Sequence, residues 1–258
     1  MNIVGLQWNS VWQNTQANID ELDKSLQTLL EQADTAPDIV LLPEVFLSGF
    51  SMRPVEFAES IDGDSMQQLK ALASKYRLAL IFGMATKQVS NTGYEHFNSA
   101  LMIDKHGELI EHYRKQKLFA YANEHHAYQA GKPSQPFVWQ GARCAMFICY
   151  DLRFPEIFRN LAKQVDIVFI VASWPESRQL HWETLLKARA IENQCFIIGV
   201  NRTGIDGNGL HYAGGSMVID PLGEILAYGR KQDEMIQAEI DIAQVCEVRK
   251  QFPFLDDM

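Results

Sequence analysis

Apolar runs of strand length alternate along the chain with segments of helical amphipathic spacing. Residues 38–43 (DIVLLP) and 166–172 (DIVFIVA) are almost continuously apolar over the length of a strand. Between such runs, Ile19, Leu22 and Leu26 recur every three or four residues, as on one face of a helix. Fully apolar strands that alternate with helices are typical of sheets covered by helices. The sequence therefore predicts an α/β fold.

The same pattern places the other elements within a single domain, residues 1–258, because no linker-like or low-complexity tract interrupts it. Asn14 or Thr15 is the expected N-cap of the first helix. Residues 116–136 show no period and are predicted to form a long loop, which in compact domains tends to be functional. The remaining strands are expected at residues 2–8, 78–85, 97–103, 108–113, up to 149, 195–201 and 235–240, and the remaining helices at 66–76, 155–163, 180–194 and near the C-terminus.

Charge and composition exclude several classes of function. The chain carries 23 Lys and Arg against 32 Asp and Glu, with no basic cluster, which argues against a nucleic-acid partner. No apolar run is long enough to cross a bilayer, and the N-terminus does not resemble a signal peptide. Four cysteines without CxxC spacing predict neither a disulfide framework nor a metal site. We therefore expect a soluble cytoplasmic protein that does not bind membranes.

Three ionisable residues, Glu44, Lys115 and Cys149, each follow an apolar, strand-like run. In α/β proteins ligands gather at the carboxyl ends of strands, so these side chains can converge. A thiol can attack a carbonyl, a carboxylate can relay the proton, and an ammonium can stabilise the oxyanion. Each residue also has an ordinary structural explanation: a small buried thiol, a solvated loop carboxylate or an exposed strand charge. Spacing alone leaves both interpretations open.

The sequence segments around these residues resemble those of a known family. Residues 41–44 (LLPE), 113–119 (YRKQKLF) and 148–156 (ICYDLRFPE) are similar, in this order, to the three signature segments of the nitrilase superfamily of carbon–nitrogen hydrolases. The resemblance runs from the first strand to the hairpin at residues 220–224. It implies a four-layer α-β-β-α sandwich and hydrolysis of a small-molecule amide that requires no metal or organic cofactor.

Carried over by position, the resemblance implies that Cys149 is the nucleophile, Glu44 the general base and Lys115 the oxyanion stabiliser. Glu124, seven residues before a glycine, is similar to the second, positioning glutamate of the family. Many relatives have histidine at the position of Lys117, which we interpret as a neighbouring charge that supports the loop. We also expect Lys115 to lower the pKa of the Cys149 thiol toward neutrality.

A narrower resemblance bears on the substrate. Residues 173–176 (SWPE), 181–194 and 199–204 (GVNRTG) are similar to bacterial omega-amidases, which implies short 2-oxo acid monoamides such as 2-oxoglutaramate and 2-oxosuccinamate. Their carboxylate needs a cation, and Arg178 and Arg202 are the candidates. The other expected substrate-binding residues are Tyr150, through its backbone N–H, and the wall residues Phe119 and Trp174.

Two arginines within the family motifs, Arg153 and Arg189, are expected to brace the loops of the site. The family commonly forms homodimers or larger homo-oligomers, and residues 242–258 are the segment expected at such an interface.

Other activities stay open at this point. Within the family, the chain can be an aliphatic amidase, a carbamoylase or a nitrilase. A catalytically silent binding module would have lost a catalytic residue, yet all four positions are occupied. A redox sensor centred on Cys149 would need a resolving cysteine, and Cys144 is predicted to face away.

Overall fold

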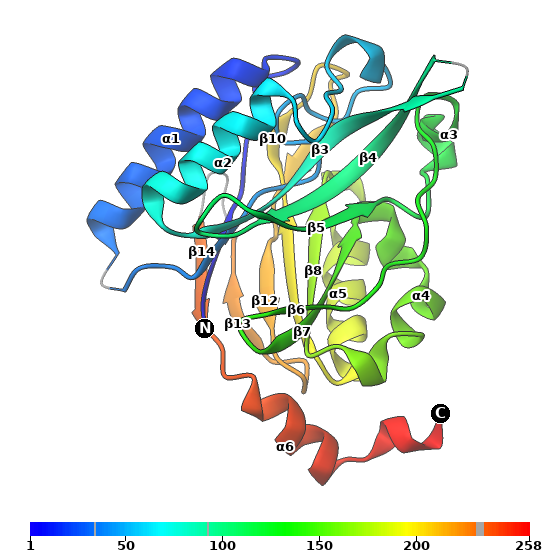
Figure 1. The fold of residues 1–258 in the computed structure, drawn as a ribbon. Coiled ribbons are helices and arrows are strands. Elements are labelled where there is room, and N and C mark those ends of the chain that lie inside the picture. The colour runs from blue at the N-terminus through cyan, green and yellow to red at the C-terminus, as the bar shows by residue number, and fades with distance from the viewer. Residues whose placement is uncertain (34, 92, 231–234) are drawn as a thin grey trace.

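Two six-stranded sheets lie face to face, with helices on both outer faces, in the computed structural model of the chain (Figure 1). The structure describes residues 1–33, 35–91, 93–230 and 235–258. The first sheet has the strand order β14-β1-β2-β3-β4-β5 and the second β13-β12-β9-β8-β7-β6. Helices α1 and α2 cover the first sheet, and α4 and α5 cover the second (Figure 1). This arrangement confirms the predicted four-layer α-β-β-α sandwich.

The first sheet is built mainly by the N-terminal part of the chain. Strands β1, β2 and β3 are parallel, and β14, β4 and β5 extend the sheet with antiparallel pairs. Its elements are β1 (Asn2–Leu6), α1 (Thr15–Gln32), β2 (Ile39–Leu41), η1 (Pro54–Glu56), α2 (Asp64–Tyr76), β3 (Ala79–Ser90), β4 (Gly93–Ile103), β5 (Leu109–Arg114) and β14 (Met235–Glu239).

In the second sheet, β7, β8 and β9 are parallel and form its centre. A separate hairpin, β10–β11, follows β9. The elements of this half are η2 (Ala120–Ala122), α3 (Glu124–Ala127), β6 (Phe137–Trp139), β7 (Ala142–Ile148), η3 (Cys149–Arg153), α4 (Pro155–Arg159), η4 (Ala162–Gln164), β8 (Ile167–Ala172), η5 (Glu176–Arg178), α5 (Gln179–Asn193), β9 (Phe196–Asn201), β10 (Thr203–Ile205), β11 (His211–Ala213), β12 (Met217–Ile219) and β13 (Ile225–Tyr228).

Alternation along β2 explains why one short strand can serve two cores. Val40 packs in the cluster formed with α1 and α2, whereas Ile39 and Leu41 belong to the core between the sheets. Successive side chains of a strand point to opposite faces, so a strand buried on both faces must be apolar throughout. The N-terminus of α1 is also as predicted, because the Asn14 side chain accepts a hydrogen bond from the N–H of Ala17.

Two predictions of local structure need correction. The hairpin β3–β4 continues to Ser90 and Gly93, well beyond the strand ends predicted at residues 85 and 97. Its distal residues are mostly polar and partly exposed, so backbone pairing holds them without an apolar pattern. The predicted loop at 116–136 contains η2 and α3. These helices are too short to produce a recognisable helical period.

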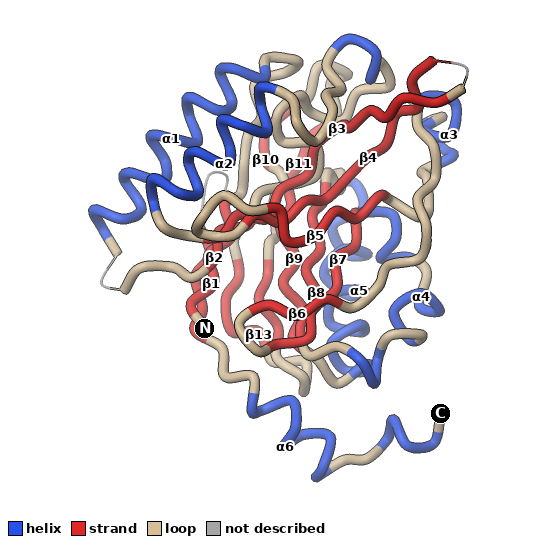
Figure 2. Tube along the Cα trace, in the orientation of Figure 1, coloured by secondary structure: helices blue, strands red, loops and turns tan. Residues whose placement is uncertain are grey.

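The C-terminal segment lies at one end of the sandwich (Figure 2). It consists of α6 (Ala243–Gln251) and η6 (Phe254–Asp257). Arg249 holds α6 to the second half of the chain by donating hydrogen bonds to carbonyl oxygens, including those of Ala162 and Val165. Across the described ranges, no helix is long and apolar enough to cross a membrane.

Candidate active site

The two sheets bring Glu44, Lys115 and Cys149 together in one place. Glu44 lies just beyond the end of β2, Lys115 follows β5, and Cys149 follows β7. The chain turns sharply at two of these ends, because Val45 and Cys149 have φ values of 43° and 44°. Such a conformation costs about 1–3 kcal/mol for a residue other than glycine, so surrounding contacts must hold it.

Lys115 forms the centre of a buried charged cluster. Its Nζ lies 2.8 Å from Glu44 Oε1 and 3.0 Å from Glu124 Oε1. The side chains of Lys115 and Glu44 are 1% and 0% exposed. An ammonium has three N–H donors, and these two carboxylates engage two of them. The remaining donor is the one with which Lys115 can hold an oxygen of a bound substrate.

Asn98 and two backbone amides complete the hydrogen bonds of the cluster. The Asn98 side chain donates to Glu44 at 2.7 Å and to Glu124 at 2.8 Å. The N–H of Ser173 donates to Glu44 Oε2 at 2.8 Å, and that of Phe119 to Glu124 Oε2 at 2.6 Å. Sequence reasoning missed Asn98 and Ser173. An amide side chain close to the apolar, buried end of β4 at residues 100–103 was the available signal for Asn98.

The charges of this cluster fix the protonation of Lys115. Burial alone lowers its pKa, but the negative charges of Glu124 and Glu44 raise it by more, and the net shift is upward. Lys115 is therefore held as an ammonium.

Cys149 lies beside this cluster and is partly exposed. Burial raises the pKa of its thiol well above the ordinary value, and the Glu44 carboxylate raises it further. Lys115 and the N–H of Ser173 act in the opposite direction but do not outweigh these effects. The expected lowering of the thiol pKa is therefore wrong, because burial and the Glu44 charge outweigh the effect of Lys115. Glu44 is close enough for its charge to act on the thiol pKa, so the thiol has a neighbouring base.

Asp151 connects the Cys149 turn to the segment that carries Lys115. Its carboxylate accepts hydrogen bonds from the Tyr113 hydroxyl at 2.8 Å, the N–H of Lys117 at 2.8 Å and the N–H of Ile148 at 3.0 Å. Burial raises the pKa of Asp151 to about 6, despite these three donors. Asp151 thus positions the catalytic candidates on both sheets.

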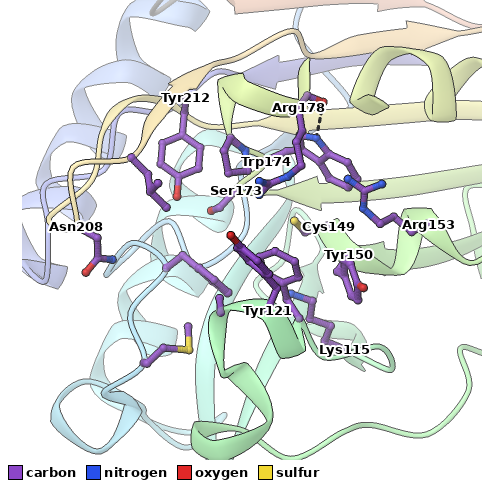
Figure 3. Close-up of a pocket in the computed structure, with 16 residues that line it drawn as sticks. Lys115, Tyr121, Cys149, Tyr150, Arg153, Ser173, Trp174, Arg178, Asn208 and Tyr212 are labelled. Carbon is purple, nitrogen blue, oxygen red and sulfur yellow. Dashed lines mark hydrogen bonds between the residues drawn. The ribbon is translucent and has the colours of Figure 1, made fainter. Parts of the chain in front are cut away.

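A cavity of about 310 Å³ opens above Cys149 (Figure 3). Aromatic and apolar side chains make up most of its wall, with two arginines at one end. It is lined by Phe50, Met52, Lys115, Phe119, Tyr121, Ala122, Cys149, Tyr150, Arg153, Ser173, Trp174, Pro175, Arg178, Asn208, Leu210 and Tyr212. The expected wall residues Phe119 and Trp174 are among them, and so is Tyr150, which was expected to act through its backbone N–H. Within the described part of the chain, no group of three or more His, Cys, Asp and Glu is placed to hold a metal ion.

The two arginines of the cavity are Arg153 and Arg178. Arg153 lies 4.6 Å from the centre of the Trp174 ring and 3.1 Å from His181 Nδ1. Arg178 lies 5.6 Å from the centre of the Phe119 ring. Burial and the charge of Arg178 both lower the pKa of Arg153, as expected for neighbouring guanidinium groups. Sequence reasoning selected Arg178 but assigned Arg153 only a bracing role.

The other predicted cations lie outside the cavity wall. Arg202 is 1% exposed and packs behind Tyr212, with its Cζ 4.6 Å from that ring. Lys117 is partly exposed and lies 3.6 Å from Glu156. Arg189 donates a hydrogen bond to the Leu152 carbonyl oxygen at 2.6 Å, which is the bracing contact expected of it.

Chemically, the arrangement offers a thiol with an adjacent base, an ammonium that faces the cavity, and two guanidinium groups a short distance away. These are the groups needed to form and hydrolyse a thioester of a substrate that carries a carboxylate. A sandwich of this topology with such a cluster between its sheets defines the class of thiol-containing carbon–nitrogen hydrolases.

Comparison with known proteins agrees with this class. The carbon–nitrogen hydrolase family matches residues 3–250, nearly the whole chain. The protein is a carbon–nitrogen hydrolase of the nitrilase superfamily.

Individual relatives match over similar lengths. Omega-amidase YafV of Escherichia coli K12 is 39% identical over 258 residues, which are 100% of this chain and 96% of that protein. The 2-oxoglutaramate amidase of Bacillus subtilis is 36% identical and covers 91% of this chain and 90% of its own length. A CN-hydrolase superfamily protein of Xanthomonas campestris, crystallised with an arsenic adduct in its active site, has a TM-score of 0.91 at 36% identity. That likeness covers 100% of this chain and 97% of the other.

Proposed function

We propose that this amidase is an omega-amidase, which hydrolyses the terminal amide of short 2-oxo dicarboxylic acid monoamides such as 2-oxoglutaramate and 2-oxosuccinamate. The observation that carries the proposal is the presence of Arg153 and Arg178 in the same cavity as Cys149. A guanidinium group is the side chain best suited to bind a carboxylate. The names of the Escherichia coli and Bacillus subtilis relatives support the same substrate class.

In the proposed reaction, Glu44 removes the proton of the Cys149 thiol as the sulfur attacks the amide carbon. Lys115 and the N–H of Tyr150 stabilise the oxyanion that forms. Glu44 then transfers the proton to the leaving nitrogen, so that the C–N bond breaks and ammonia departs. The thioester on Cys149 is hydrolysed by a water molecule that Glu44 activates. Glu124 positions Lys115 throughout.

The raised pKa of Cys149 makes Glu44 essential in this scheme. A thiol that is protonated at neutral pH attacks only as fast as a base removes its proton. The Glu44 carboxylate is oriented for this task by Lys115, Asn98 and the Ser173 N–H. General-base catalysis of this kind typically contributes about 10²–10⁴-fold in rate.

The test is release of ammonia from 2-oxosuccinamate, 2-oxoglutaramate, glutamine and a simple aliphatic nitrile, with Cys149→Ala as the inactive control. Rapid release from the 2-oxo acid amides alone supports the proposal. Arg153→Met and Arg178→Met should raise KM for these substrates while sparing a neutral amide, and Lys117→Met is the matched cation control. Equal turnover of an aliphatic amide or nitrile would favour another activity of the family.

We further propose that the enzyme acts in the cytoplasm as a homodimer or larger homo-oligomer that includes residues 242–258. The segment presents an apolar side chain, Phe254, to the surface with 67% exposure. Exposed aromatic side chains are common at protein–protein interfaces. Light scattering of the wild type and of Phe254→Ser measures the mass directly, and a monomeric wild type would contradict this expectation.

A further inference from the structure

The two ends of the cavity differ in chemistry. Arg153 and Arg178 lie on one side of Cys149, and Tyr212 and Asn208 lie on the other (Figure 3). Leu210, which lies between Asn208 and Tyr212 in the chain, also lines the cavity, as do the apolar side chains of Phe50 and Met52. We call Phe50, Met52, Leu210 and Tyr212 the apolar arm.

The apolar arm adjoins the base and the ammonium. The Phe50 ring centre lies 5.2 Å from Lys115 Nζ. Lys115 Nζ lies in turn 2.8 Å from Glu44 Oε1, so the Phe50 side of the cavity is next to the base. The Tyr212 hydroxyl already donates to Asp206 Oδ2 at 3.0 Å. What Tyr212 offers to a ligand is therefore its ring.

The direction of proton transfer relates these two ends to the two halves of an amide. The leaving nitrogen must approach Glu44, because the proton it receives comes from that carboxylate. Substituents on the nitrogen then point toward the apolar arm. The acyl chain, with its carboxylate, extends to the guanidinium groups on the other side of Cys149. A primary amide leaves the apolar arm unfilled.

We infer that the apolar arm is a leaving-group site, which binds a short alkyl or aryl substituent on the amide nitrogen and makes secondary amides substrates. This inference rests on the proposed function for the mechanism, but not for the identity of the acyl group. The thiol proton passes through Glu44 to the nitrogen, the C–N bond breaks, and a free primary amine departs. The same Cys149 thioester remains for hydrolysis.

The expected effect follows from apolar burial. Each buried methylene group raises kcat/KM about fourfold when it is bound in the transition state. We therefore expect N-butyl amides to exceed the corresponding N-methyl amides by more than roughly tenfold in kcat/KM. A nitrogen substituent that stayed in water would give no dependence on chain length.

Leu210→Trp tests the site by filling the apolar arm. Leu210 is 45% exposed, so the larger side chain is accommodated without disturbing the core. The ratio of kcat/KM for N-butyl over N-methyl amides should fall at least tenfold in this variant. Leu222→Trp, at a similarly exposed leucine in the β12–β13 turn, is the control and should keep the wild-type ratio. An unchanged ratio in Leu210→Trp would overturn the inference.

A second measurement separates this inference from the acyl specificity. N-butyl- and N-methyl-2-chloroacetamide alkylate a thiol by forming a C–S bond with loss of chloride, whatever acyl chain the enzyme prefers. Mass spectrometry should show faster labelling of Cys149 by the butyl reagent in the wild type and equal rates in Leu210→Trp. Equal rates in the wild type would refute the leaving-group site even if the enzyme proves to be an omega-amidase. Preference for the butyl reagent would uphold it even if 2-oxo acid amides are not hydrolysed.

Discussion

Lys115 and Arg202 are two buried cations, each 1% exposed, with opposite surroundings. Lys115 has carboxylate partners at 2.8 and 3.0 Å. Arg202 donates from Nε to the Thr203 carbonyl oxygen at 3.3 Å and lies against the Tyr212 ring. Its two terminal nitrogens have no hydrogen-bond partner among the residues that the structure describes.

The difference shows that burial of a charge does not by itself mark a catalytic group. A buried ion costs several kcal/mol unless partners compensate for its lost hydration. Carboxylates compensate Lys115 and raise its pKa, whereas burial lowers the pKa of Arg202. Lys115 also faces the cavity, and Arg202 lies behind its wall. Lys115, the cation whose charge is compensated by carboxylates, is therefore the one positioned for catalysis.

The largest expected effect on kcat comes from substitution of Lys115, the cation compensated by carboxylates. Lys115→Met should lower kcat by about 10³-fold, since loss of one oxyanion donor alone costs about 10²–10³. The variant also leaves the Glu44 and Glu124 carboxylates without the ammonium that both contact. Steady-state ammonia release measures the loss. Lys117→Met should stay within threefold, and a greater loss there than in Lys115→Met would show that the wrong lysine was chosen.

Asp151 extends the comparison to a buried anion that has hydrogen-bond donors but, among the described residues, no salt-bridge partner. Its pKa of about 6 exceeds the ordinary 3.8, so its contribution to stability is complete below pH 3.8 and is lost as the pH rises through about 6. The free energy of unfolding of the wild type relative to Asp151→Asn should therefore fall by about 3 kcal/mol over that range.

Urea unfolding at pH 4 and pH 7 measures this difference. Asp166 is the matched control with the opposite sign. Burial raises its pKa, but hydrogen bonds and charge from Arg143 lower it by more, and the net shift is downward. The wild type should gain stability relative to Asp166→Asn as the pH rises. A parallel pH profile for the two variants would contradict the assignment of Asp151.

Asn98 sharpens the comparison because it donates hydrogen bonds to the two carboxylates and not to a cation. Asn98→Ala removes a donor shared by Glu44 and Glu124 and should lower kcat by about 10–100-fold with little change in KM. Stopped-flow detection of the acyl-enzyme locates the affected step. Asn14→Ala removes only a helix cap and is the control. A rise in KM at constant kcat would move Asn98 from positioning to substrate binding.

The smallest effect on stability and activity is expected for substitution of Arg202. Arg202→Met removes a desolvated charge, so Tm should be unchanged or higher. Its kcat/KM should remain within about threefold, because the guanidinium is outside the cavity wall. If Arg202 instead binds the substrate carboxylate, kcat/KM for 2-oxo acid amides would fall more than 100-fold while a neutral amide is spared.

Much of the architecture is predictable because both faces of the central strands are buried. Apolar runs such as residues 166–172 indicate strands without reference to the rest of the fold, and the layer order follows from the family resemblance. The polar end of the β3–β4 hairpin escaped prediction because backbone pairing, and not side-chain burial, holds it.

For the site, residue type and motif suffice to select the candidates but not their partners. Asn98 contacts Glu44 across 54 positions of sequence, and Ser173 contacts it across 129. No local pattern encodes such contacts, since they depend on how the two sheets dock. The direction of the Cys149 pKa was mispredicted for the same reason. The pKa of the thiol depends on its burial and on the charges of Glu44 and Lys115, which only the folded cluster reveals.

The origin of the cluster in both sheets has a consequence for folding kinetics. Glu44, Asn98 and Lys115 follow or belong to strands of the first sheet, and Cys149 and Ser173 follow strands of the second. Either sheet alone therefore carries only part of the groups that form the cluster. Pairings as distant as β1 with β14 give the chain many non-local contacts, which slow refolding. During refolding, recovered activity should therefore lag behind recovered circular dichroism, so that activity reports the last step of assembly.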